Sequence, residues 1–280
     1  LIDAILTPFK MKQYKRALTI AGSDPSGGAG LQADLKTFSA LGVYGASAVV
    51  AVVDENTVGV YGVHPIPVNF VVGQIRSVID DIGVDAVKIG MLHDSELICA
   101  VNDTLKCYPD VRNIVVDPVM VATSGDALLQ PEAVATLRDV LIPNARVITP
   151  NLPEASLLLG EEIKHQDQFV DAAKALSRLG GGSVSVMLKA GHLENDELID
   201  IFYNAEDDEI VRLASPRVNT VNTHGTGCTL SSAIAAYLAK GYGLSEAATA
   251  AKRYIADAIV AGADYSIGKG HGPVHPFDLN

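Results

Sequence analysis

The sequence contains no tryptophan, only three cysteines and few aromatic residues, which make up 5% of its 280 positions. The cysteines, Cys99, Cys107 and Cys228, are widely spaced, and none of them lies in a Cys-x-x-Cys pair or beside histidines at the spacing of a zinc site. An odd number of scattered thiols provides no disulfide framework and is typical of the reducing cytosol, so we expect a cytoplasmic protein.

Positive charge is also scarce. The chain has 21 lysines and arginines against 33 aspartates and glutamates, a net charge of -12 at pH 7, and no basic cluster offsets it. This balance argues against a nucleic-acid partner or an anionic membrane surface. No apolar run reaches membrane-spanning length, and the first ten residues are too short and wrongly flanked for a signal peptide. An anionic ligand must therefore be captured by local features of the fold.

The chain suits one large globular domain. It has 280 residues, of which 48% are hydrophobic and 19% charged, enough to bury a sizeable core. No linker rich in proline, glycine or serine divides it. Met11 resembles a natural start. We therefore predict a single domain over residues 12–280, with residues 1–11 as an N-terminal extension outside the fold.

Short β-branched runs alternate with segments of helical spacing. We predict strands at residues 17–22, 46–53, 86–90, 113–118, 146–150 and 183–191, and helices over 31–41, 69–82, 95–107, 132–141 and 168–179. Two further strands, 198–204 and 209–215, are too close for a crossover helix and should be antiparallel, and helices are predicted over 227–240 and 244–262. This pattern indicates an α/β fold with a mostly parallel sheet covered on both faces, which binds ligands beyond the carboxyl ends of its strands.

The turn after the first predicted strand contains Gly28-x-Gly30-x-x-Ala33, the spacing of a dinucleotide-binding loop. Asp54, at the end of the second predicted strand, would then take the place of the ribose-binding acid. However, residues 23–27 separate the strand from the first glycine of this pattern, which argues against the tight turn that such a site needs. The same stretch lacks the lysine and the hydroxyl residue of a P-loop, so a Walker A site is excluded.

A second glycine-rich turn, THGTGC over residues 223–228, leads directly into an apolar segment. Consecutive amides at such a turn can bind an anion without a basic side chain, because glycine lets the backbone approach closely and the helix dipole adds positive charge. The alternative interpretation is a helix-capping turn followed by a small buried thiol, Cys228.

Polar residues follow several predicted strands. Asp117 follows one strand, and Asn151 and Glu154 follow the next. Two carboxylates from separate strands beside an anion loop resemble a magnesium-nucleotide site, and Lys189 could neutralise phosphate charge. Taken singly, each carboxylate could be a helix cap and Lys189 an edge lysine whose stem covers apolar surface. Asp34, in the first turn of a predicted helix, could serve only to complement the helix dipole.

The chain carries the motifs ALTIAGSDPSGGAGLQADLKTFSALGVYG, VKIGML, VVDPVM, ITPNLPEA, AGH, SPRVNT, NTHGTGCTLS and GKGHGPVHP. Together they resemble the hydroxymethylpyrimidine/phosphomethylpyrimidine kinase family of thiamine biosynthesis, from about Arg16 to Phe277. The resemblance implies a ribokinase-like fold, a single-domain three-layer αβα sandwich with a mostly parallel central sheet. It also implies ATP and Mg²⁺ as cofactors, phosphorylation of a hydroxymethylpyrimidine and then of its monophosphate, and a homodimer.

The resemblance further assigns roles to individual residues. It implies a pyrimidine pocket lined by Gly22, Asp34, Met91 and Val119. It implies an anion hole formed by Gly225, Thr226, Gly227 and Cys228. It places two residues near the nucleotide phosphates, Asn151 and Lys189, and two residues around Mg²⁺, Asp117 and Glu154.

Cys228 poses a chemical question, because most ribokinase-like sugar kinases have aspartate at this position. An alcohol loses its proton as it attacks phosphorus, so the first step benefits from a base, which a thiolate stabilised by the amides and the helix dipole could supply. The second step has a phosphate as nucleophile and needs positioning rather than a base. We therefore predict that Cys228→Ala slows the first phosphorylation more than the second.

One residue departs from the family pattern. Glu55 stands in Glu55-Asn56-Thr57, where the family commonly has glutamine, and we predict that Glu55 binds the substrate. An ionised glutamate can only accept hydrogen bonds, so either the ring binds protonated, or Glu55 is itself protonated, or it turns away as a solvated loop residue. Pyridoxal kinase is therefore an alternative activity, and a non-catalytic pyrimidine-binding regulator is the alternative from another class.

Overall fold

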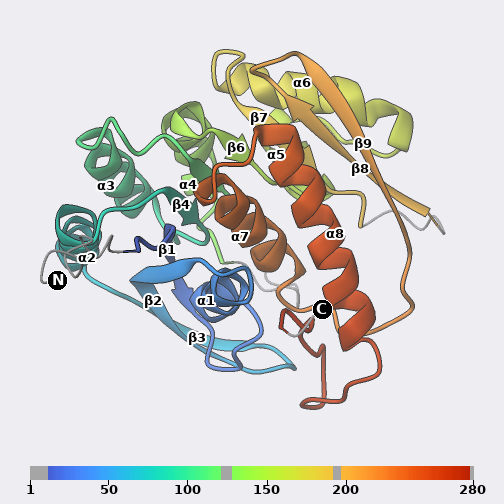
Figure 1. The fold of residues 1–280 in the computed structure, drawn as a ribbon, viewed down its shortest axis with the longest axis horizontal. Helices are drawn as coiled ribbons and strands as arrows, with labels where there is room; N and C mark the ends of the chain where they lie inside the picture. Colours follow the sequence, from blue (N-terminus) through green and yellow to red (C-terminus); the bar gives the residue numbers. More distant parts are fainter. Residues whose placement is uncertain (1–11, 121–127, 192–196, 278–280) are drawn as a thin grey trace, which may run out of the picture.

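The alternating segments fold into one large sheet with helices on both faces (Figure 1). The computed structural model describes residues 12–120, 128–191 and 197–277. The N-terminal extension predicted for residues 1–11 lies outside the described residues. Within the described ranges, no helix is long and apolar enough to cross a membrane.

The sheet has nine strands among the described residues, in the order β3-β2-β1-β4-β5-β6-β7-β8-β9. Their bounds are β1 Arg16–Ser23, β2 Tyr44–Glu55, β3 Val60–Pro65, β4 Ala86–Ile89, β5 Ile114–Val116, β6 Val147–Ile148, β7 Ser185–Leu188, β8 Glu197–Asn204 and β9 Glu209–Pro216. In this order, the six strands from β2 to β7 are parallel to one another. The pairs β2 with β3, β7 with β8 and β8 with β9 are antiparallel, which confirms the predicted pairing of 198–204 with 209–215.

Eight α-helices connect and cover these strands in the described part of the chain. Their bounds are α1 Gly30–Ala40, α2 Val68–Asp81, α3 Ser95–Lys106, α4 Ala133–Thr136, α5 Leu152–Leu159, α6 Phe169–Leu179, α7 Thr226–Ala239 and α8 Leu244–Gly262. Short helical turns of other types, η1 Leu137–Leu141, η2 Ile142–Asn144 and η3 Gln166–Gln168, complete the connections.

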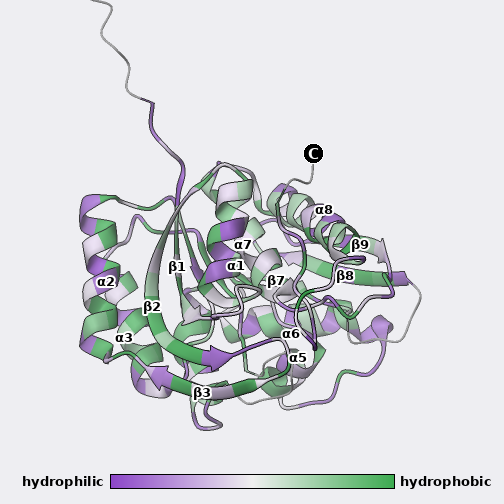
Figure 2. Cartoon of the chain, turned by 90° about the horizontal axis from the view of Figure 1, so that it is seen from below, coloured by the Kyte–Doolittle hydropathy of each residue, from purple (hydrophilic) through white to green (hydrophobic). Residues whose placement is uncertain are grey.

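Two hydrophobic clusters on opposite faces of the sheet create three layers. Successive strand residues point to opposite faces, so Leu18 and Ile20 of β1 join the cluster with α2 to α6, whereas Ala17 joins the cluster with α1, α7 and α8. In Figure 1, α7 and α8 lie together over one face. Figure 2 shows hydrophilic and hydrophobic residues alternating along surface helices such as α2 and α3. The predicted three-layer αβα sandwich is confirmed.

Two elements were not predicted from the sequence. β3 is a short edge strand whose residues are all at least partly exposed, so it lacks the alternation of buried and exposed positions that marks a strand. α5 begins with Pro153 in its first turn and ends at Gly160, whose φ is 72°. Proline inside the start and glycine past the end are recognised helix signals. The predicted helix 132–141 is present but continues as a π-turn after Thr136.

The parallel strands bring polar residues to one edge. β1 is followed by Asp24, β5 by Asp117 and β7 by Lys189, and β2 ends with Glu55. Since the carboxyl ends of parallel strands meet at the same edge, these residues gather there although up to 165 positions separate Asp24 from Lys189.

Candidate active site

A cavity of about 700 Å³ opens at this edge of the sheet. It is lined by every residue predicted from the sequence to bind a ligand except Asp34. The lining residues come from both glycine-rich turns and from the ends of six parallel strands, so the fold assembles the site from distant parts of the chain.

The two glycine-rich turns pack directly on each other. Gly225 has a φ of 78° and caps α7 at its amino end, and a methyl group added to it would overlap the Gly28 carbonyl oxygen. A methyl group on Gly28 would in turn overlap the ring of His224. Glycine at both positions therefore serves a close backbone approach, which fixes the start of α7 against the turn before α1.

The first turn of α7 supplies the predicted anion-binding amides. Gly227 and Cys228 lie where helical amides have no carbonyl partner within the helix. Thr226 differs, because its amide and its hydroxyl both donate to the Thr223 carbonyl, over 3.2 and 2.7 Å. Within residues 226–228, the amides that remain for an anion are therefore those of Gly227 and Cys228, and Thr226 holds the turn in shape.

The Cys228 thiol lines the cavity, and its surroundings favour the protonated form. Burial raises its pKa to about 11, and the negative charges of Asp34 and Asp117 act in the same direction. The Lys88 ammonium and a hydrogen bond from the Gly30 amide lower the pKa but do not offset these effects. The lowered pKa expected from the sequence is thus contradicted, since the helix dipole and the amides are outweighed by desolvation.

Asp34 lies beneath the cavity rather than in its lining. It is fully buried, and its carboxylate accepts hydrogen bonds from Thr19 over 2.5 Å, Ser232 over 2.6 Å and Lys88 over 2.9 Å. Lys88 is fully buried as well, in the middle of β4. The prediction that Asp34 lines the pyrimidine pocket does not match this position. Asp34 instead neutralises the buried Lys88 ammonium, which burial alone would discharge.

Asp117 and Lys189 form an ion pair under the first turn of α7. Their charged atoms lie 3.2 Å apart, and Thr149 donates to the same Asp117 oxygen over 2.8 Å. Burial alone would raise the pKa of Asp117, but the ammonium groups of Lys189 and Lys88 hold it below its usual range. A methyl group on Gly227 would lie 3.3 Å from both members of the ion pair. The ion pair therefore adjoins the predicted anion site.

Glu154 and Asn151 cap α5 and also line the cavity. The Asn151 side chain accepts from the Glu154 amide over 2.9 Å, and the Glu154 carboxylate accepts from the Asn151 amide over 2.8 Å, a capping box. Burial raises the pKa of Glu154 to about 7, the nearby Asp117 adds to this rise, and Lys189 opposes it. Both residues therefore combine the structural role considered for them with a place in the site.

Gly22, Met91, Val119 and Glu55 line the other part of the cavity, as predicted. A methyl group on Gly22 would lie 2.8 Å from the Met91 methyl carbon, so glycine leaves room for that side chain. Glu55 does not turn away into solvent. Its side chain is 10% exposed, and one of its oxygens lies 3.7 Å from His224 Nε2.

The dinucleotide interpretation of the first turn is not supported by the structure. The amides of Gly28 and Ala29 donate to Asp24 Oδ2 over 3.0 and 2.7 Å, so they are not directed at a pyrophosphate. Asp54 is exposed and is not part of the cavity lining.

Sequence reasoning missed three residues of this region, Lys88, Asp24 and His224. A signal existed for Lys88, because a lysine inside a run of buried strand residues has to be paired. A signal existed for Asp24 as well, because an aspartate side chain can accept a hydrogen bond from the amide two positions later. Here the Ser26 amide donates to Asp24 over 2.7 Å. Nothing in the local sequence indicated that His224 reaches Asp24, 200 positions away.

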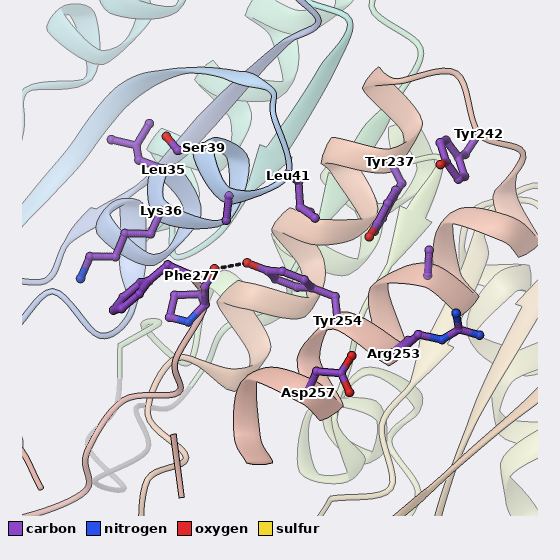
Figure 3. A pocket seen from close by; sticks show the side chains of 13 residues that line it. Leu35, Lys36, Ser39, Leu41, Tyr237, Tyr242, Arg253, Tyr254, Asp257 and Phe277 are labelled. Carbon is purple, nitrogen blue, oxygen red and sulfur yellow. Dashed lines mark hydrogen bonds between the residues drawn. The ribbon is translucent and has the colours of Figure 1, made fainter. Parts of the chain in front are cut away.

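A second cavity, of about 860 Å³, lies between α1, α7, α8 and the C-terminal segment (Figure 3). Tyr237, Tyr242 and Tyr254 line it, and the Tyr254 hydroxyl donates to the Pro276 carbonyl. It lies on the side of the sheet that α1, α7 and α8 cover, and no ligand-binding residue predicted from the sequence lines it. The first cavity is therefore the candidate active site.

The arrangement suits transfer of an anionic group. The amides at the start of α7 and the Lys189 ammonium can bind a phosphoryl group, while Asp117 and Glu154 offer oxygen ligands to a hard cation. Cys228 lines the same cavity as Met91, and the charge of Asp117 acts on its thiol.

Comparison with known proteins agrees with this chemistry. The model of the family described as phosphomethylpyrimidine kinase matches residues 24–275. The hydroxymethylpyrimidine/phosphomethylpyrimidine kinase of Rhizobium meliloti (strain 1021) is 52% identical over 262 residues, 93% of this chain and 96% of the relative. The enzyme of the same name from Escherichia coli (strain K12) is 45% identical over 262 residues, 93% of this chain and 97% of the relative.

Solved structures of related kinases share the fold. The crystal structure of an ADP complex of Bacillus subtilis pyridoxal kinase has a TM-score of 0.84 and 42% identity, covering 94% of this chain and 98% of that one. Pyridoxal kinase from Staphylococcus aureus in complex with AMP-PCP and pyridoxal has a TM-score of 0.84 and 34% identity, covering 95% of this chain and 94% of that one. The protein is a ribokinase-like kinase and belongs to the phosphomethylpyrimidine kinase family.

Proposed function

We propose that this protein transfers the γ-phosphoryl group of ATP to the hydroxymethyl group of 4-amino-5-hydroxymethyl-2-methylpyrimidine. It then phosphorylates the resulting monophosphate to the diphosphate, as a step of thiamine biosynthesis. Relatives that are 45 and 52% identical over nearly their whole length carry the name of this pair of activities.

The single observation that carries the proposal is the continuous chain of residue contacts that runs along the cavity. Glu55 lies beside His224, which directly precedes Gly225, and Gly225 packs on Gly28. Farther along the same turn, Gly227 adjoins the ion pair of Asp117 and Lys189. An acceptor near Glu55 and a phosphoryl donor near Lys189 would therefore meet at the start of α7, where the amides can stabilise the charge that develops during transfer.

The acceptor end suits a small aromatic ring. Gly22, Met91 and Val119 provide a narrow apolar space, and Glu55 provides one polar contact. A pyrimidine with a hydroxymethyl group could direct that group toward Cys228. Because the pKa of Cys228 is raised, the thiol would orient the hydroxyl rather than remove its proton. A loose transition state for phosphoryl transfer is compatible with late loss of that proton.

The donor end suits a nucleotide with Mg²⁺. Leu198, Ile255 and Ile259 offer apolar lining beyond the ion pair, suited to a purine. Asp117 and Glu154 are carboxylates of the kind that Mg²⁺ prefers, held by Thr149 and by the capping box. Mg²⁺ held by them would neutralise charge on the phosphates, while Lys189 and Asn151 would orient the phosphate groups from the protein side.

Pyridoxal is the second candidate acceptor. It is favoured by one observation, the likeness to solved pyridoxal kinases at 34 to 42% identity. It too is an aromatic ring with a hydroxymethyl group. The test is to measure kcat/KM with Mg-ATP for both acceptors. The proposal expects the higher value for the pyrimidine, and a higher value for pyridoxal would overturn the pathway assignment while leaving the kinase standing.

We also infer a homodimer, a cytoplasmic location and a kinase domain over residues 12–280. Exposed apolar side chains on the hairpin of β2 and β3, Val52, Val58 and Tyr61, support a partner surface, and the three unpaired thiols support a reducing compartment. Light scattering at micromolar concentration tests the dimer. Cell fractionation tests the location, and activity of a chain starting at Met11 tests the boundary.

A further inference from the structure

Three titratable side chains meet at the acceptor end of the cavity. Asp24, Glu55 and His224 come from three separate segments, and one ligand atom of each lies within 4.8 Å of the others. All three line the cavity, and none is more than 13% exposed at its side chain. The close approach of two carboxylates away from bulk water needs a physical explanation, because two negative charges there would repel each other.

Asp24 holds its negative charge firmly. Its Oδ2 atom accepts from the amides of Gly28 and Ala29, from the Ser26 hydroxyl over 2.9 Å and from His224 Nε2 over 2.9 Å. Burial alone would raise the pKa of Asp24, but these donors hold it well below its usual range. Asp24 therefore remains ionised and acts as a fixed acceptor beside Glu55.

Glu55 is the partner that keeps a proton. A carboxyl oxygen of Glu55 lies within 4.8 Å of one of Asp24, and two carboxyl groups this close together and away from bulk water are favoured when one of them keeps a proton. Because the amide donors point at Asp24 and not at Glu55, that proton resides on Glu55. Burial and the Asp24 charge raise the pKa of Glu55 to about 8. Near neutral pH the Glu55 side chain is therefore a carboxylic acid.

We propose that Glu55 recognises its substrate as a carboxylic acid, which donates its single proton to a nitrogen of the bound ring while Asp24 remains ionised beside it. The inference rests on the proposed pyrimidine kinase activity and adds Asp24 and His224 as positioning residues for ring recognition. One carboxyl oxygen accepts from an amino group on the ring, and the proton bridges the other oxygen and the adjacent ring nitrogen.

The chemistry selects one kind of ring. An amino group next to a ring nitrogen matches a carboxyl group with one proton, in the same way that it matches the acceptor and donor of a glutamine amide. Pyridoxal has an aldehyde beside its hydroxymethyl group and offers Glu55 no such donor. Without the proton, an ionised Glu55 would face the lone pair of the ring nitrogen, so affinity for the pyrimidine falls when the proton is lost.

Other charged groups near these residues do not replace this proton. The Lys36 ammonium donates to the Gly27 carbonyl over 2.6 Å and is exposed. Asp24 Oδ2 already accepts from four donors, and Oδ1 accepts from the Ser26 amide over 2.7 Å. Asp24 bears the negative charge beside Glu55, and His224 donates its hydrogen bond to Asp24. The protonation of Glu55 itself therefore decides whether a proton is present for the ring.

The test compares the pH dependence of KM for the pyrimidine in the natural protein, in Glu55→Gln and in Asp54→Asn. Glutamine supplies its own donors and needs no titrating proton. The natural protein should show a KM that is level to about pH 7.5 and about 10-fold higher at pH 9, whereas Glu55→Gln should change less than about 2-fold. Asp54 is the exposed neighbour on the same strand, and Asp54→Asn should follow the natural protein. All three proteins contain Glu154 and Cys228, so the effect of their titration on KM cancels when the KM of each variant is divided by that of the natural protein at the same pH.

A binding measurement without nucleotide gives a second readout. At pH 8.5, calorimetry in two buffers should detect uptake of about three quarters of a proton when the pyrimidine binds the natural protein, and almost none for Glu55→Gln. Equal proton uptake or parallel KM profiles in the two proteins would overturn the inference and leave the kinase proposal standing. A natural protein that neither binds nor phosphorylates the pyrimidine would overturn the proposed function itself.

Discussion

Gly225→Ala tests the close packing of the two glycine-rich turns. Two costs follow from the structure. Gly225 has a φ of 78°, where a side chain costs about 1–2 kcal/mol. The added methyl group would also overlap the Gly28 carbonyl oxygen, a backbone atom that no rotamer change can move aside. Overpacking of this kind costs a further 1–3 kcal/mol, roughly.

Gly42→Ala is a matched control, because Gly42 has a φ of 72° and open space around it. We expect Gly42→Ala to lower the free energy of unfolding by about 1–2 kcal/mol and Gly225→Ala by about 2–5 kcal/mol. In melting temperature these losses correspond to about 2–8 °C and about 4–20 °C for a chain of this size.

The assay combines thermal unfolding with the steady-state rate of phosphorylation. Gly225→Ala should also lower kcat about 100-fold at a temperature where it remains folded, because a displaced α7 terminus misplaces the amides of Gly227 and Cys228. Gly42→Ala should retain the natural kcat. Equal stability and equal activity in the two variants would refute the close packing as the reason for glycine at position 225.

Four further substitutions test the buried charges and the thiol. Lys88→Met leaves Asp34 without its partner and should lower the free energy of unfolding in urea by about 3–5 kcal/mol, and a loss below about 1 kcal/mol would contradict the buried ion pair. Cys228→Ala should slow the first phosphorylation about 100-fold and more than the second, while Cys228→Ser, which can still orient a hydroxyl, should stay within about 10-fold of the natural rate. Single-turnover rates decide this, and an equal loss in Ser and Ala variants would restore the base role. Because the pKa of Glu154 is raised to about 7, a proton competes with Mg²⁺ below that pH. The apparent affinity for Mg²⁺ should fall about 5-fold from pH 7 to pH 6 in the natural protein but not in Glu154→Gln, and a fall of equal size in both would exclude Glu154 as the titrating group.

Local sequence patterns were sufficient to predict most of the strands of the sheet. The parallel strands are short apolar runs between turn residues, and each lies at or within about three residues of its predicted bounds. β3 was missed because an exposed edge strand does not bury alternate side chains. Gly225 to Cys228 could be identified because a glycine-rich turn before a helix has a direct physical use.

Properties that depend on three-dimensional surroundings could not be read from the sequence. Asp34 was expected to line the pocket, but it is buried beneath the cavity, where it binds Lys88, 54 positions away in the chain. The pKa of Cys228 depends on burial and on the charges of Asp34 and Asp117 from other parts of the chain, which outweigh the local helix dipole. The role of Glu55 depends on Asp24 and His224, neither of which is near it in the chain.

Phosphorus NMR of the products formed from Mg-ATP and the hydroxymethylpyrimidine tests the central claim most directly. The account predicts a pyrimidine monophosphate that is converted to the diphosphate by the same protein, with two ATP consumed for each pyrimidine. Phosphorylation of pyridoxal alone, with no pyrimidine phosphate at any time, would contradict it.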